Sequence, residues 1–96
     1  MLEIRPSCEH CNKKLPYNSI QAMICSFECT YCTTCAQKLF KNICPNCTGN
    51  LTPRPIRPSY HIDKHPAATT VIFDPKDLKI THQQFSDYGH IPPEKR

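Results

Sequence analysis

The chain has 96 residues and a formal net charge of +4, and 39% of its residues are hydrophobic, a figure that includes eight cysteines. Without the cysteines, too few apolar side chains remain for a core of ordinary size, so disulfides or metal ions must supply stability. No apolar run approaches the roughly 18 residues of a membrane span, and no signal-peptide run opens the chain. We therefore expect a cytoplasmic protein with reduced thiols and no membrane partner.

All eight cysteines lie in the first half of the chain, in the order Cys-x2-Cys, Cys-x3-Cys-x2-Cys-x2-Cys and Cys-x2-Cys. They are Cys8, Cys11, Cys25, Cys29, Cys32, Cys35, Cys44 and Cys47. Cys-x2-Cys units suit metal knuckles, in which two sulfurs converge on one ion, better than separate crosslinks. Eight thiolates fill two tetrahedral sites, and Zn²⁺ is the ion expected there. Because a Cys₄ site offers no open position to substrate, we expect structural zinc and no enzymatic activity.

The first part of the chain, residues 1–52, is predicted to be the zinc-binding domain. Residues 22–25 and 29–32 are short and β-prone, which predicts a small hairpin. Thr33 or Thr34 is then expected to cap a helix that runs to about Lys41, with Leu39 and Phe40 facing inward. The predicted fold class is a small, metal-stabilised α+β domain with one hairpin and one short helix.

The rest of the chain divides into a linker and a tail. Residues 53–66 begin with three prolines in six residues, which favours an extended linker. In the tail, residues 67–96, a strand is predicted over 69–73, followed by a helix with Asp74 as its N-cap and Gly89 at its end. A docked helix and a flexible tail both remain open.

The basic surplus of the first half is a weak argument for nucleic-acid binding. Residues 1–58 hold seven Lys and Arg against three acidic residues, and residues 59–96 hold five of each sign. A zinc ion with four thiolates carries a charge of −2, so two such sites balance the surplus. General attraction to phosphate is correspondingly reduced.

Two ways of sharing the cysteines between two ions are open. Sequential pairing groups the first four cysteines and then the last four. Interleaved pairing assigns Cys8, Cys11, Cys32 and Cys35 to site 1, and Cys25, Cys29, Cys44 and Cys47 to site 2. Interleaving ties distant parts of the chain together, which suits a domain with a small core, and we favour it.

The order Cys8-x2-Cys11-x13-Cys25-x3-Cys29-x2-Cys32-x2-Cys35-x8-Cys44-Pro-x-Cys47 resembles a RING finger with cysteine at the usual histidine position. That resemblance implies a RING-like, treble-clef cross-brace with interleaved sites. RING fingers act as ubiquitin ligases, but this chain has Glu9-His10 where such ligases carry a bulky apolar residue, and it contains no tryptophan. The scaffold carries over better than the ligase surface.

A closer resemblance covers residues 1–58. The segments Glu3-Ile4-Arg5-Pro6, Ile24-Cys25-Ser26-Phe27-Glu28-Cys29-Thr30, Cys44-Pro45-Asn46-Cys47 and Arg54-Pro55-Ile56-Arg57-Pro58 are similar to a family of small bacterial cysteine-rich proteins. That family is known only as a domain of unknown function, so the resemblance implies a compact zinc module without implying an activity.

The expected function is binding of another macromolecule, most readily a protein, by a structural zinc module. The surface residues expected to give specificity are Glu9, His10, Lys13, Lys14, Phe27, Arg54, Arg57 and the tail. The alternatives are a RING-type ligase adaptor and a nucleic-acid-binding zinc finger that uses Arg54 and Arg57. An iron–sulfur cluster is disfavoured because eight residues, not three, precede the final Cys-Pro.

Overall fold

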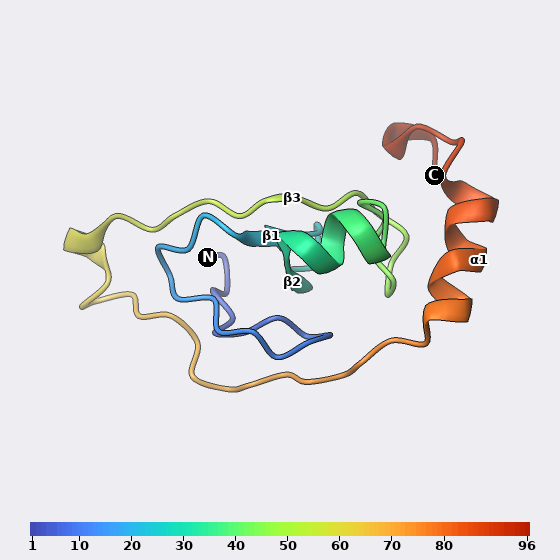
Figure 1. Ribbon diagram of the computed structural model, residues 1–96. Coiled ribbons are helices and arrows are strands. Elements are labelled where there is room, and N and C mark those ends of the chain that lie inside the picture. The colour runs from blue at the N-terminus through green and yellow to red at the C-terminus, as the bar shows by residue number, and fades with distance from the viewer.

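A three-stranded antiparallel sheet lies at the centre of the chain in this computed structural model, which describes residues 1–96 (Figure 1). The strands are β1 (Ala22–Ile24), β2 (Thr30–Cys32) and β3 (Thr52–Pro53), in the order β2-β1-β3. The predicted hairpin is confirmed, because β1 pairs with β2 from Ala22 opposite Cys32 to Ile24 opposite Thr30. The two strands thereby hold Cys25 and Cys29 at either side of one tight turn.

The third strand falls where the sequence predicts the boundary between domain and linker. Pro53 lies opposite Met23 and Thr52 opposite Ile24, so the proline-rich segment begins inside the sheet. Proline is compatible with this position because β3 is an edge strand and its missing N–H breaks no inner ladder. The chain then makes a 3₁₀ turn, η2 (Ser59–His61).

The helix predicted after β2 is shorter than expected and is a π-helix, η1 (Cys35–Leu39). Neither threonine caps it through a side chain, contrary to the prediction. The Phe40 N–H donates to the Cys35 carbonyl at 3.0 Å, and this wider turn leaves Phe40 buried while Leu39 stays exposed. The helix ends before Lys41, because Lys41 and Asn42 both adopt left-handed backbone, with φ of 53° and 63°.

Cysteines make up much of the core. Six of the 13 residues in the main buried cluster are cysteines, and the large apolar members are Leu15, Met23, Tyr31, Phe40 and Leu51. The rings of Tyr31 and Phe40 meet edge to face, with centroids 4.9 Å apart. The interior is therefore small and rich in sulfur, as the composition predicts.

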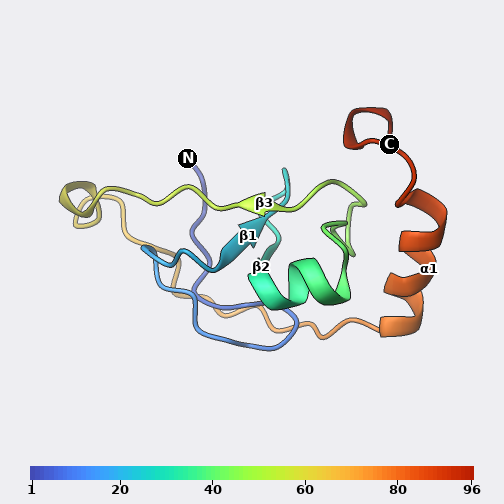
Figure 2. The same cartoon turned by 45° about the horizontal axis from the view of Figure 1, so that its top comes forward.

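The tail runs back along the molecule and ends in a helix, α1 (Leu78–Tyr88), followed by a 3₁₀ turn, η3 (Pro93–Lys95) (Figures 1 and 2). The strand predicted over 69–73 is wrong. This segment belongs to no sheet. Val71 and Phe73 are more than half exposed, so their burial does not stabilise a strand at this place. None of the helices is long and apolar enough to cross a membrane.

The start of α1 also differs from the prediction. Asp77, and not Asp74, is the N-cap, since its side chain accepts a hydrogen bond from the Lys79 N–H at 2.9 Å. Gly89 follows the last helical residue, as predicted. Its backbone is right-handed, a conformation open to any residue, so glycine is required here because it has no side chain. A Cβ there would lie 2.7 Å from the Phe85 ring.

Candidate metal centre

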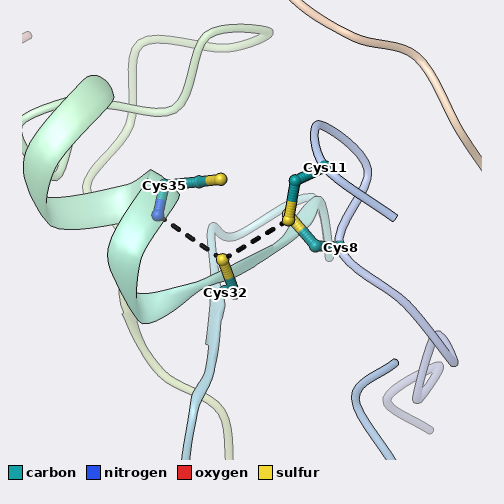
Figure 3. Close-up of side chains that lie close together, drawn as sticks. All are labelled: Cys8, Cys11, Cys32 and Cys35. Carbon is teal, nitrogen blue, oxygen red and sulfur yellow. Dashed lines mark hydrogen bonds between the residues drawn. The ribbon is translucent and has the colours of Figure 1, made fainter. Parts of the chain in front are cut away.

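Four cysteines from three separate segments converge in one cluster (Figure 3). The sulfurs of Cys8, Cys11, Cys32 and Cys35 all lie within 4.8 Å of one another; we call this group cluster 1. The Sγ atoms of Cys11 and Cys32 are 3.7 Å apart. With Zn–S bonds of about 2.3 Å, the edge of a sulfur tetrahedron is about 3.8 Å, whereas a disulfide bond is about 2.0 Å long. The spacing matches ligands around one ion.

The backbone positions this cluster through three local structures. Cys8 and Cys11 lie in the loop before the sheet, Cys32 ends β2, and Cys35 begins η1. The Cys35 N–H, unpaired within the helix, is directed at the Cys32 Sγ at 3.5 Å. Exposed N–H groups in a first helical turn favour negative charge, and therefore a thiolate.

A second group contains Cys25, Cys44 and Cys47, whose sulfurs also lie within 4.8 Å of one another; we call it cluster 2. Cys29, predicted as its fourth member, lies outside this group. Its Sγ accepts a hydrogen bond from the Asn46 side chain at 3.3 Å, and Asn46 also donates to the Tyr31 hydroxyl. The structure thus brings together seven of the eight cysteines in the interleaved grouping, and metal ligation by Cys29 stays a prediction.

The loop that carries Cys8 and Cys11 is a closed β-turn structure, which we call knuckle 1 (residues 6–15). The Asn12 N–H donates to the Cys8 carbonyl at 2.9 Å, and the Cys8 N–H donates to the Lys13 carbonyl at 2.8 Å. Ser7 and Lys14 form an antiparallel bridge outside this pair. These bonds hold both cysteine side chains on one side of the loop.

The loop that carries Cys44 and Cys47, knuckle 2 (residues 42–51), repeats this pattern at every step. The Thr48 N–H donates to the Cys44 carbonyl at 2.9 Å, and the Cys44 N–H donates to the Gly49 carbonyl at 2.7 Å. Ile43 and Asn50 form the equivalent bridge. The same loop conformation therefore presents two cysteines to each cluster, through knuckle 1 in cluster 1 and knuckle 2 in cluster 2.

Both knuckles need a left-handed residue directly after their second cysteine. Asn12 has a φ of 65° and Thr48 a φ of 63°. Asparagine tolerates this conformation well, whereas a β-branched threonine does not. The sequence analysis missed this feature, although an asparagine after Cys-x2-Cys is the signal that marks it.

Backbone N–H groups also reach the sulfurs of cluster 2. The Phe27 N–H donates to the Cys25 Sγ at 3.3 Å, and the Gly49 N–H donates to the Cys47 Sγ at 3.4 Å. Hydrogen bonds of this kind stabilise the charged form of a ligand. They support thiolates that carry a metal more than buried neutral thiols.

Without a metal, the burial of these sulfurs works against ionisation. Desolvation raises the pKa of the Cys35 and Cys44 thiols strongly above the ordinary cysteine value. Desolvation also raises the pKa of Cys29, against the opposing effect of the Asn46 hydrogen bond. Buried thiols grouped this closely become a stable set of thiolates only with a cation between them, so the donor set fits a thiophilic metal ion.

Two charged residues expected on the surface are instead buried, and that expectation is wrong. Glu9 is 3% exposed and accepts from the Arg5 guanidinium at 2.9 Å and from the Thr30 N–H. This carboxylate joins knuckle 1 to β2 beside cluster 1. An acidic residue inside Cys-x2-Cys gives no sequence signal for such a role.

Arg54 is 4% exposed and has no acidic partner. Its guanidinium donates to the carbonyls of Arg5 at 2.9 Å, Leu15 at 3.2 Å and Pro16 at 2.8 Å. Burial lowers its pKa from the ordinary arginine value. Arg54 therefore ties the residue after β3 to both ends of knuckle 1. Its buried guanidinium binds backbone carbonyls and is not available on the surface.

His10 belongs to neither cysteine cluster. Its Nδ1 accepts a hydrogen bond from the Lys76 N–H at 2.9 Å, and its ring meets Phe40 edge to face at 5.2 Å. The histidine inside knuckle 1 is thus a contact for the tail.

Comparison with known proteins adds a family to this geometry. The family model described as "Protein of unknown function (DUF1272)" matches residues 1–57, more than half of the chain and all eight cysteines. The chain belongs to DUF1272. An uncharacterized protein of Rhizobium meliloti (strain 1021) is 47% identical to this DUF1272 chain over 76 residues, which cover 79% of the chain and 90% of the relative. The resemblance to a bacterial family of unknown function is thereby confirmed, and no solved structure matches the chain.

Proposed function

We propose that this DUF1272 protein is a structural two-zinc module that binds another protein. The observation that carries the zinc assignment is cluster 1, in which four cysteine sulfurs from three segments lie within 4.8 Å of one another. A complete Cys₄ set favours zinc, and it leaves the ion no open position for catalysis. The metal would supply crosslinks in place of a larger apolar core.

The same proposal assigns the second zinc to cluster 2 with Cys29 as its fourth ligand. Cys29 shares the hairpin turn with Cys25, whose N–H donates to the Cys29 carbonyl at 3.2 Å. The two ligand sets then alternate along the chain, as in the cross-brace of RING fingers. This RING-like arrangement rests on the spacing of the ligands and on the matched knuckles.

Native mass spectrometry of the purified chain tests the zinc assignment directly. We expect two zinc ions per chain. Cys8→Ser and Cys32→Ser should each leave one ion bound, since both remove a ligand of site 1, and the double variant should do no more than either alone. Cys29→Ser should remove the other ion. Sequential pairing would instead make Cys29→Ser and Cys8→Ser affect the same ion.

Binding to a protein is supported by exposed apolar side chains on the cysteine-rich half. Phe27 is 70% exposed at the tip of the hairpin and Ile20 is 86% exposed just before it. Aromatic anchors of this kind commonly dominate protein interfaces. The nucleic-acid alternative loses support, because Arg54 is buried and Arg57 donates to the Leu2 and His65 carbonyls.

Crosslinking mass spectrometry in cells with the intact chain would test the interaction. A partner whose crosslinks are lost in Phe27→Ser but kept in Tyr60→Ser, a similarly exposed aromatic on the turn η2, would support it. Identical crosslinks in both variants would exclude the hairpin tip as the binding surface.

A further inference from the structure

The last part of the tail, residues 74–96, contacts both knuckles; we call it the strap. At its beginning, the Asp74 N–H donates to the Glu9 carbonyl at 2.7 Å, and the Lys76 N–H donates to His10 Nδ1 at 2.9 Å. Both acceptors lie between the two cysteines of knuckle 1. The strap is therefore attached to the loop that presents half of cluster 1.

The other end of the strap is attached to knuckle 2. The Gln84 side-chain amide on α1 donates to the Pro45 carbonyl at 3.1 Å. The Arg96 guanidinium donates to the Thr48 carbonyl at 2.8 Å. Pro45 lies between the two cysteines of this knuckle, and Thr48 follows them directly.

Every one of these four bonds has its donor on the strap and its acceptor on a knuckle. A zinc ion with four thiolates carries a charge of −2, so the knuckles also attract a cationic donor such as Arg96. The attachment is nevertheless light, since Thr81 is the only buried residue of α1. Segments with so little buried surface open at low free-energy cost.

The strap is bonded to His10 and Thr48, which adjoin in sequence the two least buried cysteines. Cys11 is exposed and Cys47 is half-buried, whereas the other six cysteines are buried. A competing chelator gains a coordination position when a ligand cysteine swings away, and that movement requires its knuckle to open. Opening either knuckle moves the carbonyls or the ring to which the strap is bonded.

We propose that the strap retains the metal: bonded to both knuckles, it keeps them from opening and so slows the loss of their ions to competing ligands. This inference rests on the proposed zinc sites, and it gives the tail a role that the predicted linker-and-tail organisation does not. It requires that opening of the strap precedes metal release.

The chain offers a matched pair of variants at neighbouring positions. Gln84 and Arg96 reach knuckle 2, whereas Gln83 donates only to Asp87 within α1 and Lys95 has no ion-pair partner. The metal-loaded full chain of Q84A/R96A is compared with Q83A/K95A and the native sequence. Excess EDTA is added, and zinc remaining on the protein is followed by native mass spectrometry. Amide exchange of α1 is measured on the same samples.

We expect Q84A/R96A to start with two zinc ions and to lose one of them about tenfold faster than the native chain, because two hydrogen bonds, one of them charge-assisted, no longer hold the strap. The α1 amides should exchange faster in the same variant, and Q83A/K95A should match the native chain in both measurements. Equal metal-loss rates in the two double variants, with faster α1 exchange in Q84A/R96A, would overturn the strap proposal and leave the zinc sites intact. A native chain that holds no zinc would overturn both.

Discussion

At the scale of single residues, the two knuckles share one backbone conformation although their sequences differ. Asn12 and Thr48 occupy equivalent left-handed positions, but the conformation costs a β-branched residue roughly 1–2 kcal/mol. Thr48 recovers part of this through its hydroxyl, which donates to the Cys47 carbonyl at 2.6 Å. Knuckle 2 is thus the more strained of the two.

Thr48→Asn should therefore stabilise the metal-loaded chain by about 1 kcal/mol, because asparagine adopts this backbone at lower cost. Urea unfolding followed by circular dichroism measures the change. The reverse substitution, Asn12→Thr, serves as the matched test and should destabilise by a similar amount. An unchanged midpoint in both variants would mean that the loops accommodate either residue.

Arg54→Lys should lower stability by about 2–3 kcal/mol, since a lysine cannot donate to three carbonyls held in the plane of a guanidinium. The Arg5, Leu15 and Pro16 carbonyls would each lose a hydrogen-bond donor. Arg57→Lys, at a partly exposed arginine, should cost clearly less in the same unfolding measurement. Equal losses at the two positions would argue against a special role for the buried guanidinium.

At the scale of elements, the hairpin and the end of α1 follow from short-range signals and were predicted. The cysteine spacing predicted that each close Cys-x2-Cys pair converges locally, but it left open how the pairs are shared between two ions. The interleaved grouping was favoured because it ties distant parts of a chain with a small core together. The π-turn of η1 could not be predicted, since it depends on burying Phe40 and placing Cys35 in cluster 1 at the same time. Neither could β3, whose two residues pair only because the sheet offers a free edge.

The N-cap of α1 is Asp77 in the structure and Asp74 in the sequence-based prediction, and substitutions at the two positions distinguish these assignments. Asp77→Ala should reduce the stability of α1 by about 1 kcal/mol, because the bond to the Lys79 N–H is lost. Amide exchange of the first turn of α1 measures this. Asp74→Ala removes the cap that the sequence predicted, and it should leave that turn unchanged. The opposite ranking would place the start of the helix at Asp74.

At the scale of the whole molecule, the chain is elongated, with extents of 43 × 26 × 18 Å, and nearly half of its core residues are cysteines. Composition predicted that so small a core would need metal ions or disulfides for its stability. The buried roles of Glu9 and Arg54 could not be predicted, because charged side chains are placed inside only when distant backbone groups come together to receive them. The path of the tail across both knuckles depends on the same long-range assembly.

Removal of the metal should unfold residues 8–47 at neutral pH, because structural zinc contributes about 10–16 kcal/mol in small zinc-finger peptides. Addition of EDTA, followed by ¹H–¹⁵N NMR, should collapse the amide dispersion, and re-addition of zinc should restore it. Retention of full dispersion after chelation would contradict a structural role for the ions.

Acidification should release the metal. Burial raises the pKa of Cys35 and Cys44 in the metal-free fold, so those thiols hold protons at neutral pH and must lose them when zinc binds. Zinc affinity is therefore lost as pH falls. For the metal-free fold alone the sign is opposite: raised pKa values favour it below the ordinary thiol pKa of about 8.5 and disfavour it as pH rises.

Calorimetric titration with zinc in buffers of different ionisation enthalpy counts the released protons. We expect close to one proton per cysteine ligand at pH 7. Near-zero release, or zinc retained at pH 3, would contradict ligation by thiolates.

The sulfur-rich core has a consequence for how this protein responds to its surroundings. If the clusters hold zinc as we propose, the same side chains form the interior and bind the ions, so the share of folded chains would depend on the concentration of free zinc. A scarce supply would leave an open polypeptide exposed to proteases, and a restored supply would rebuild the complete surface in one step. The zinc supply would then determine whether the folded protein, with its complete surface, is present.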